Sequence, residues 1–169
     1  VPPTSQLDRV VNFDVMAGGG AMFGSGGLIV CNEERSVVDL TRVLLAFDQM
    51  ESCGKCFPCR LGMTHLLEML ERACIGASRD GDMELMDRVG NNMRTGSLCG
   101  HGQLGYNPVS SALRFFEEEF RAQMRGEGPI SIGPFVGPPA SRRGAQTSGD
   151  TPTASVKRDF VVHLELVLF

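Results

Sequence analysis

The sequence predicts a mainly α-helical protein, organised as a small four-helix bundle. Apolar residues recur at helical spacing in four segments between residues 35 and 126. Signals typical of helix starts, Ser36 with Asp39 and Asn107 with Pro108, precede two of these segments. The connections between the segments are short, which favours neighbouring helices packed around one core.

The N-terminal part of the chain differs from the helical part. Residues 16–27, MAGGGAMFGSGG, are rich in glycine and lead into the apolar run LIVC. This pattern predicts turns followed by one short buried strand, with Cys31 as a core residue of that strand. A phosphate-binding loop is disfavoured, because the glycine spacing misses the GxGxxG pattern and the lysine of a P-loop is missing.

Each of the four helical segments has an apolar face. They begin at Ser36, near Cys59, after the RDGD stretch and at Asn107, and Gly76 is expected to end the second. The residues expected to face the core are Val37, Leu40, Leu44, Phe47, Met63, Leu66, Leu67, Leu70, Cys74, Met83, Met86, Val89, Met93, Val109, Leu113, Phe116 and Phe120.

After residue 126 the composition changes again. Residues 127–169 begin with a stretch rich in Pro, Gly and Ser, which predicts an irregular tail. The last ten residues, FVVHLELVLF, alternate enough to predict a possible terminal strand, whose partner is expected outside this chain. Just before the tail, the acidic run in FFEEEF is expected to form a solvated helix face.

Composition and charge exclude several classes of function. The net charge of -4 and the absence of a basic cluster argue against nucleic acid as a partner. No apolar run reaches the roughly 18 residues of a membrane span, and no signal pattern opens the chain, so no direct membrane insertion is expected. No Ser-His-Asp or Cys-His arrangement suggests a nucleophile, and no catalytic residue is assigned.

The strongest chemical signal is the stretch ESCGKCFPCR, in which Cys53, Cys56 and Cys59 form C-x2-C-x2-C. A [4Fe-4S] cluster needs four thiolates, and runs of this kind take the fourth from elsewhere in the sequence. Cys99, in the glycine-flanked segment GSLCGHGQ, is the expected fourth ligand. Cys74 lies on an apolar helical stripe and is expected to be a buried, inert thiol.

Alternative interpretations of these residues remain open. A zinc site of four cysteines is the competing metal site, although structural zinc sites usually pair two C-x2-C units. A disulfide set is disfavoured, because cysteines this close together pair with strain. His101 is interpreted as an ordinary loop histidine, with a hydrogen bond to a cluster sulfide as the alternative. Lys55 and Arg60 are either electrostatic tuners of the site or solvated loop charges.

Four segments together resemble the C-terminal part of the NADH-binding flavoprotein subunit of respiratory complex I: GSGGLIV, ESCGKCFPCRLG, GSLCGHGQLGYNPV and LRFFEEEF. Diaphorase subunits of NAD-linked hydrogenases and formate dehydrogenases carry similar segments. The resemblance implies that residues 1–34 end a β-grasp (ubiquitin-like) domain, that residues 35–126 form a helical [4Fe-4S]-binding domain, and that residues 127–169 follow as a tail. His101 departs from the family, which more commonly has a bulky apolar residue at this position.

The resemblance also implies ligands and a function. Cys53, Cys56, Cys59 and Cys99 would be the cluster ligands. The chain would transfer electrons through the cluster as part of a larger oxidoreductase, an NADH-oxidising, FMN-containing subunit of NADH:quinone oxidoreductase. A hydrogenase or formate dehydrogenase diaphorase is one alternative, and a non-catalytic interaction module stabilised by metal is the other.

The remaining expectations concern cofactors, partners and location. The FMN and NAD sites of the family lie upstream of this chain, so no flavin or NAD residue is assigned, and the chain alone is expected to lack NADH dehydrogenase activity. Expected partners are a thioredoxin-like [2Fe-2S] subunit and a larger iron-sulfur subunit. The expected location is the cytoplasm, or the cytoplasmic or matrix side of a membrane-bound complex, as a peripheral subunit.

Overall fold

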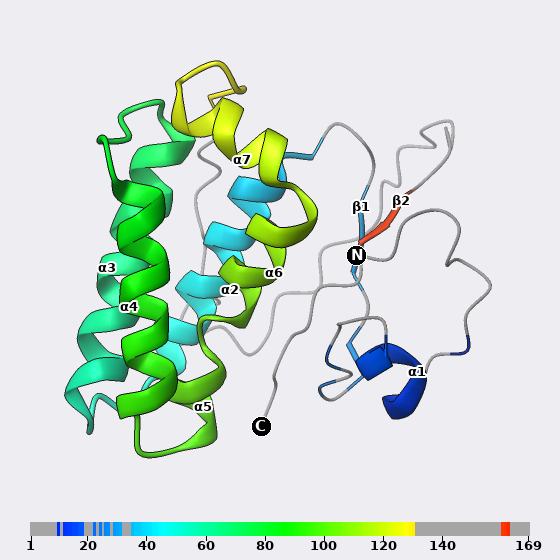
Figure 1. Cartoon of the computed structure of the whole chain (residues 1–169), viewed down its shortest axis with the longest axis vertical. Coiled ribbons are helices and arrows are strands. Elements are labelled where there is room, and N and C mark those ends of the chain that lie inside the picture. The colour runs from blue at the N-terminus through cyan, green and yellow to red at the C-terminus, as the bar shows by residue number, and fades with distance from the viewer. Residues whose placement is uncertain are drawn as a thin grey trace, which may run out of the picture.

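A computed structural model describes residues 35–130 without a gap, together with residues 10, 12–18, 22, 24, 26, 27, 29–31 and 160–162. The described part is mainly helical, as predicted. Helices α2 to α7 gather into one bundle, and α1, β1 and β2 lie to one side of it (Figure 1). The elements are α1 (Phe13–Gly18), β1 (Ile29–Cys31), α2 (Val37–Glu51), α3 (Phe57–Cys74), α4 (Asp82–Gly96), α5 (Gly100–Leu104), α6 (Asn107–Phe115), α7 (Glu117–Met124) and β2 (Phe160–Val162).

Helix α2 begins where the sequence predicts. Ser36 is its N-cap, and the Ser36 hydroxyl accepts a hydrogen bond from the Asp39 N–H at 3.4 Å. The Val37 N–H, which has no partner within the helix, donates to Glu119 Oε1 of α7 at 2.7 Å. The start of α2 is therefore held by a local side chain and by one from far along the chain.

Helix α3 lies beside α2 and starts earlier than predicted. It begins at Phe57 rather than near Cys59, because Pro58 in its first turn has no N–H to leave unpaired. It ends at Cys74, shortly before Gly76, as predicted. Cys59 is thereby placed in the first turn of the helix, where its position is fixed by regular backbone.

Other elements differ from the sequence-based expectations. Helix α5 was expected as a loop, and its five glycine-rich residues carry too short an apolar pattern to reveal it. The fourth predicted helix is divided at Phe116, whose φ of -131° and ψ of 37° interrupt the helical geometry between α6 and α7. Helix α1 lies where only turns were expected.

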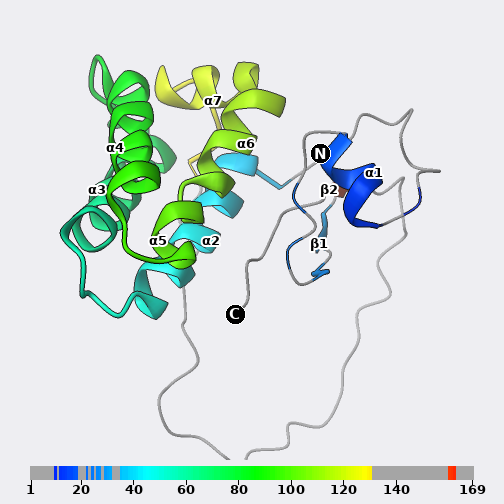
Figure 2. The same cartoon turned by 60° about the horizontal axis from the view of Figure 1, so that its bottom comes forward.

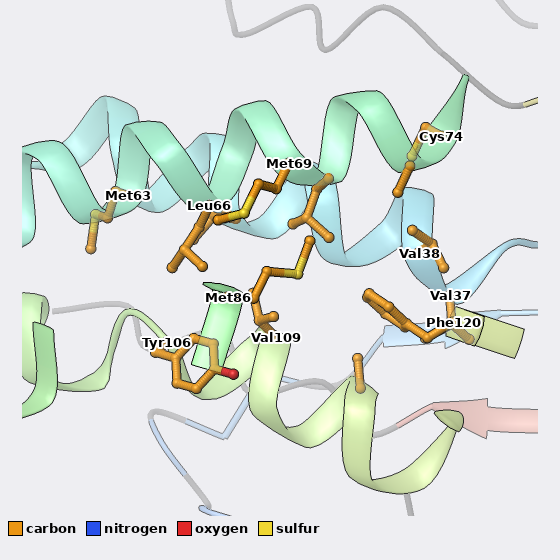
Figure 3. Packing of buried hydrophobic residues seen from close by; sticks show 14 of the residues in the cluster. Val37, Val38, Met63, Leu66, Met69, Cys74, Met86, Tyr106, Val109 and Phe120 are labelled. Atoms are coloured by element: carbon orange, nitrogen blue, oxygen red, sulfur yellow. The ribbon is translucent and has the colours of Figure 1, made fainter. Parts of the chain in front are cut away.

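The core of the bundle lies between α2, α3, α4, α6 and α7. Figure 3 shows Leu66 and Met69 of α3 pointing toward Met86 of α4 and Val109 of α6, and Leu66, Met86 and Val109 are 0% exposed. Burial of each side chain of this size contributes about 1.5 to 3 kcal/mol. The buried members of the cluster are Val37, Val38, Leu45, Cys59, Met63, Leu66, Met69, Leu70, Ala73, Cys74, Met86, Met93, Tyr106, Val109, Ala112 and Phe120.

The two described strands form a small antiparallel sheet in which Ile29 pairs with Val162. The terminal strand was expected to pair outside this chain, and its partner is instead β1. Ile29 and Cys31 pack against Leu44 of α2, and Cys31 is half-buried rather than in the central core. The β-grasp assignment of residues 1–34 and the domain limits stay predictions, and most of the predicted tail lies outside the described residues.

The short helix α5 marks one end of the bundle. Figure 1 shows α5 at the lower end of the bundle, and Figure 2 shows this end turned toward the viewer. Within the described part of the chain, no helix has both the length and the apolar character needed to cross a membrane.

Candidate metal centre

The three clustered cysteines lie where α2 gives way to α3. Cys53 is exposed in the connection, Cys56 is the half-buried N-cap of α3, and Cys59 is buried in the first turn, 4% exposed. Gly54 takes a left-handed backbone conformation with a φ of 69°, which a residue with a side chain rarely adopts. Gly54 thus provides the turn between the first two cysteines.

The fourth predicted ligand approaches from the junction of α4 and α5. Cys99 is exposed and stands at the N-cap position of α5. The preceding residue, Leu98, donates its backbone N–H to the sulfur of Cys56. The charges of Cys53, Cys56 and Cys99 all act on Cys59, so the fold brings the four thiols of the prediction into one neighbourhood.

Close packing at Gly102 holds the two ligand-bearing segments together. A Cβ atom at Gly102 would lie 2.6 Å from Ser97 Oγ and 2.8 Å from Cys59 Cβ. Contacts this short are not found for real side chains, so α5 approaches α3 in this way only because residue 102 is glycine. The spacing between Cys59 and the Cys99 segment therefore depends on this residue.

Hydrogen bonds lower the pKa values of the Cys56 and Cys59 thiols, whereas burial raises them. The pKa of Cys56 is lowered chiefly by the Leu98 N–H, against desolvation, with the Cys59 N–H and the Ser97 hydroxyl adding to the effect. The pKa of Cys59 is raised, mainly by burial and then by the neighbouring thiolates, although a hydrogen bond from Ser52 opposes the rise. A bound metal centre favours the thiolate form of both residues.

His101 connects α5 to another helix. Its Nε2 lies 3.0 Å from the backbone carbonyl of Asp48, in the last turns of α2. Burial raises the pKa of the Asp48 carboxyl to about 6, and the charge of His101 lowers it in opposition. Sequence reasoning missed Asp48, because only the fold places it beside a histidine of another helix. A hydrogen bond from His101 to a cluster sulfide stays the untested alternative to the ordinary histidine of the sequence-based interpretation.

The donor set fits an iron-sulfur cluster. Within residues 35–130 and the other described positions, no three His, Cys, Asp or Glu side chains converge closely enough to hold a single metal ion. A cubane makes a different demand, because each thiolate binds its own iron at a separate corner. Four thiols supported by amide and hydroxyl donors meet that demand, while the ligand assignment itself remains a prediction.

The other residues considered from sequence have varied surroundings. Cys74 is 1% exposed, and burial raises its pKa to about 11, which agrees with the predicted inert thiol. Lys55 and Arg60 are exposed, so their tuning role stays a prediction. Phe57 and Leu98, adjacent to the candidate ligands Cys56 and Cys99, are 72% and 75% exposed. The cysteine end of the bundle therefore presents exposed apolar side chains beside the candidate ligands.

Comparison with known families agrees with this geometry. Residues 39–123 match the family described as the NADH-ubiquinone oxidoreductase-F iron-sulfur binding region. The chain belongs to this family. The iron-sulfur binding region runs from Asp39, near the start of α2, to Gln123, near the end of α7, and it contains all four candidate ligand cysteines.

Curated relatives of this iron-sulfur binding region come from two kinds of enzyme. The NADP-reducing hydrogenase subunit HndC of Solidesulfovibrio fructosivorans is 32% identical over 118 residues, which are 70% of this chain and 24% of the relative. An NADH-quinone oxidoreductase subunit of Rhizobium meliloti is 31% identical over 124 residues, 73% of this chain and 30% of the relative. The chain thus spans less than a third of the length of these relatives.

Solved structures give the same picture. An NAD+-reducing [NiFe]-hydrogenase in its H2-reduced state aligns with a TM-score of 0.52 and 31% identity, covering 53% of this chain and 16% of that chain. In the air-oxidised state the TM-score is 0.54 and the identity 29%, covering 62% of this chain and 18% of that chain. The helical iron-sulfur fold is therefore shared with a hydrogenase chain.

Proposed function

We propose that this chain binds one [4Fe-4S] cluster through Cys53, Cys56, Cys59 and Cys99 and transfers single electrons inside an NADH-oxidising enzyme complex. The observation that carries the proposal is the approach of the Cys99 segment to the three-cysteine turn, within the iron-sulfur binding region of the family. When bound, the cluster supplies one-electron redox chemistry. The chain's own residues orient the thiolates, bury Cys59 and direct hydrogen-bond donors at sulfur.

Two enzyme contexts are supported for this role. The first is NADH:quinone oxidoreductase, in which the chain would be the C-terminal part of the subunit that oxidises NADH with FMN. The second is a diaphorase of an NAD-linked hydrogenase or formate dehydrogenase, which the similarity to HndC and to the NAD+-reducing hydrogenase structures favours. In both contexts the flavin and NAD sites belong to other parts of the protein.

Partners and location follow from either context. We infer that the chain assembles with a thioredoxin-like [2Fe-2S] subunit and a larger iron-sulfur subunit, as a peripheral component facing the cytoplasm or matrix. The exposed ligands Cys53 and Cys99 support electron exchange at this end, because short distances to a partner cofactor favour transfer.

The first test is the composition and redox behaviour of the chain reconstituted without oxygen. About four irons and four sulfides per chain are expected, with an EPR signal that appears on reduction with dithionite. Reversible reduction without unfolding would support electron transfer over a purely structural role. Zinc without sulfide would contradict the proposal and favour the metal-stabilised interaction module.

A matched pair of cysteine variants tests the ligand set. Cys99→Ala is expected to abolish or convert the cluster, because it removes one of four thiolates. Cys74→Ala is the control, since this thiol is buried among α2 and α3 residues, and its EPR spectrum and iron content should match those of the unmodified chain. The ligand assignment would be wrong if Cys74 proved necessary and Cys99 dispensable.

A further inference from the structure

Two serine hydroxyls lie beside two different ligand cysteines, and nothing in the cysteine motif itself accounts for them. We propose that Ser52 and Ser97 donate hydrogen bonds to the thiolates of Cys59 and Cys56 and thereby raise the reduction potential of the site. This inference rests on the proposed function, because it concerns the same four thiolates.

Ser52 is arranged as a donor to Cys59. Its Oγ lies 3.4 Å from Cys59 Sγ and accepts the Gly54 N–H at 3.3 Å. With its oxygen engaged by the amide, the hydroxyl proton is left for the sulfur, and a thiolate has no proton of its own to give. The side chain is not needed to end α2, since the backbone N–H of Ser52 already bonds to Gln49.

Ser97 shows a hydroxyl that is buried without a well-formed partner. The residue is 5% exposed, and its Oγ makes no hydrogen bond of normal geometry within the described chain. Its backbone is fully used, because the N–H bonds to Met93 and the carbonyl accepts from Gln103 Nε2 at 3.0 Å. A buried hydroxyl left in this state costs free energy, which indicates a partner that arrives with the metal centre.

The surroundings of Ser97 point its hydroxyl toward the ligands. Gly102 packs directly on Ser97 Oγ and on Cys59 Cβ, so the hydroxyl is confined between α5 and the first turn of α3. The Ser97 hydroxyl also contributes to the lowered pKa of Cys56, after the larger effect of the Leu98 N–H. The Cys56 sulfur is therefore the partner that we assign to this hydroxyl.

The effect on redox chemistry follows from charge. Reduction adds a negative charge to the site, and a hydrogen bond to sulfur becomes stronger as the sulfur becomes more negative. Donors to thiolate therefore stabilise the reduced form more than the oxidised form. Because both hydroxyls act on the same cluster, the double variant is expected to lower the potential further than either single variant, without strict additivity.

The test is an EPR-monitored redox titration of Ser52→Ala, Ser97→Ala and the double variant. Each single change is expected to lower the equilibrium constant for one-electron reduction by about tenfold, equivalent to about 59 mV. Ser52→Thr keeps the hydroxyl and should restore the original potential. Ser110→Ala is the control, because its hydroxyl bonds to the Asn107 carbonyl in the first turn of α6.

The outcomes separate a failure of this inference from a failure of the proposed function on which it rests. Alanine variants that keep four irons per chain but show the potential of Ser110→Ala would overturn the inference and leave the proposed function standing. An unmodified chain that assembles no cluster would overturn both. If Ser97→Ala fails to assemble a cluster, Ser52→Ala and Ser52→Thr decide the matter, since the Ser52 side chain is dispensable for ending α2.

Discussion

Helix α2 carries two carboxylates with different surroundings, Asp39 near its start and Asp48 near its end. Near its start, Arg42 Nη2 lies 2.8 Å from Asp39 Oδ1, and the arginine side chain is only 4% exposed. Near its end, burial shifts the pKa of Asp48 to about 6, and the charge of His101 opposes the shift. The Asp39 carboxylate is paired with the Arg42 guanidinium. Ionisation of Asp48 is opposed by its burial and therefore lowers the stability of the fold.

Asp48 should make stability depend on pH. Its pKa is raised above the ordinary value of 3.8, so the stability that its neutral form contributes is complete below about pH 4 and is lost as the pH rises through about 6. Asp48→Asn removes this loss and keeps the backbone carbonyl that His101 contacts. At neutral pH the variant should be more stable by about 1 to 2 kcal/mol, a figure reduced for partial solvent screening.

Urea titrations between about pH 4 and pH 8, followed by circular dichroism, measure the free energy of unfolding of both proteins. The difference between Asp48→Asn and the unmodified chain should widen as the pH rises from about 4 to about 6 and then level off. Glu118→Gln is the control, because Glu118 is exposed, and it should show no comparable trend. A gap that stays constant across this range would contradict the assigned burial effect.

At the scale of elements, α7 supports the ends of two other helices. Glu119 accepts the free N–H of Val37 at the start of α2. Gln123 Nε2 donates to the Ala73 carbonyl at the end of α3 at 3.1 Å, and to the Pro129 carbonyl at 3.2 Å. A helix of only eight residues thus satisfies the Val37 N–H that α2 leaves unpaired, and it adds a second donor to the Ala73 carbonyl, which also accepts the Gly76 N–H.

Glu119→Ala should destabilise the bundle by about 1 kcal/mol, through loss of the capping bond and of a negative charge at the N-terminus of α2. Glu118→Ala, one position away and exposed, should change stability by less than about 0.5 kcal/mol. Thermal unfolding of the two variants under identical conditions gives the comparison. Equal effects would mean that Glu119 acts only through helix propensity.

These elements also show what sequence reasoning can reach. The start of α2 was predictable because Ser36 and Asp39 are near neighbours, and the α3 and α4 stripes because each repeats over several turns. The break at Phe116 and helix α5 were not, since neither has a local signal. The acidic run before Phe120 was expected to be solvated, yet Glu119 bonds to the distant Val37.

In the candidate site too, some residues were predictable from the sequence and others were not. Cys53, Cys56 and Cys59 were recognisable from their spacing, and Cys99 from its glycine-flanked segment. The hydroxyls near the sulfurs were not recognisable, because serine is common in turns, and only tertiary packing distinguishes Ser97 from any other serine. Motifs predict ligands, whereas the groups that tune them depend on packing between segments far apart in sequence.

For the whole molecule, the apolar core and the ligand end are distinct. Side chains such as Leu45, Leu70 and Phe120 fill the interior of the bundle, and Cys59 is the one candidate ligand among the buried members of this core. The segment carrying Cys99 is short and contacts α2, α3 and α4. Removal of the metal centre is therefore expected to unfold the cysteine end locally and to leave the rest of the bundle folded.

Hydrogen exchange on the apo and reconstituted forms tests this expectation. Amides of residues 97–105 and 52–56 should lose protection when iron is removed, while those around Leu45 and Leu70 should keep it. We expect protection to differ between the two regions because Cys53 and Cys99 are exposed and lie outside the buried core. Loss of protection throughout α2 and α3 would show that metal is required for folding, as in a structural module.

The meeting of Cys99 with the three-cysteine turn also constrains biosynthesis. A ribosome exposes Cys53, Cys56 and Cys59 well before it exposes Cys99, and α4 must fold back along α3 before the fourth thiol arrives. During synthesis, the chain therefore passes through a stage in which Cys53, Cys56 and Cys59 are present but Cys99 is not yet available. Binding of an intact cluster by all four thiols therefore has to follow translation of α5.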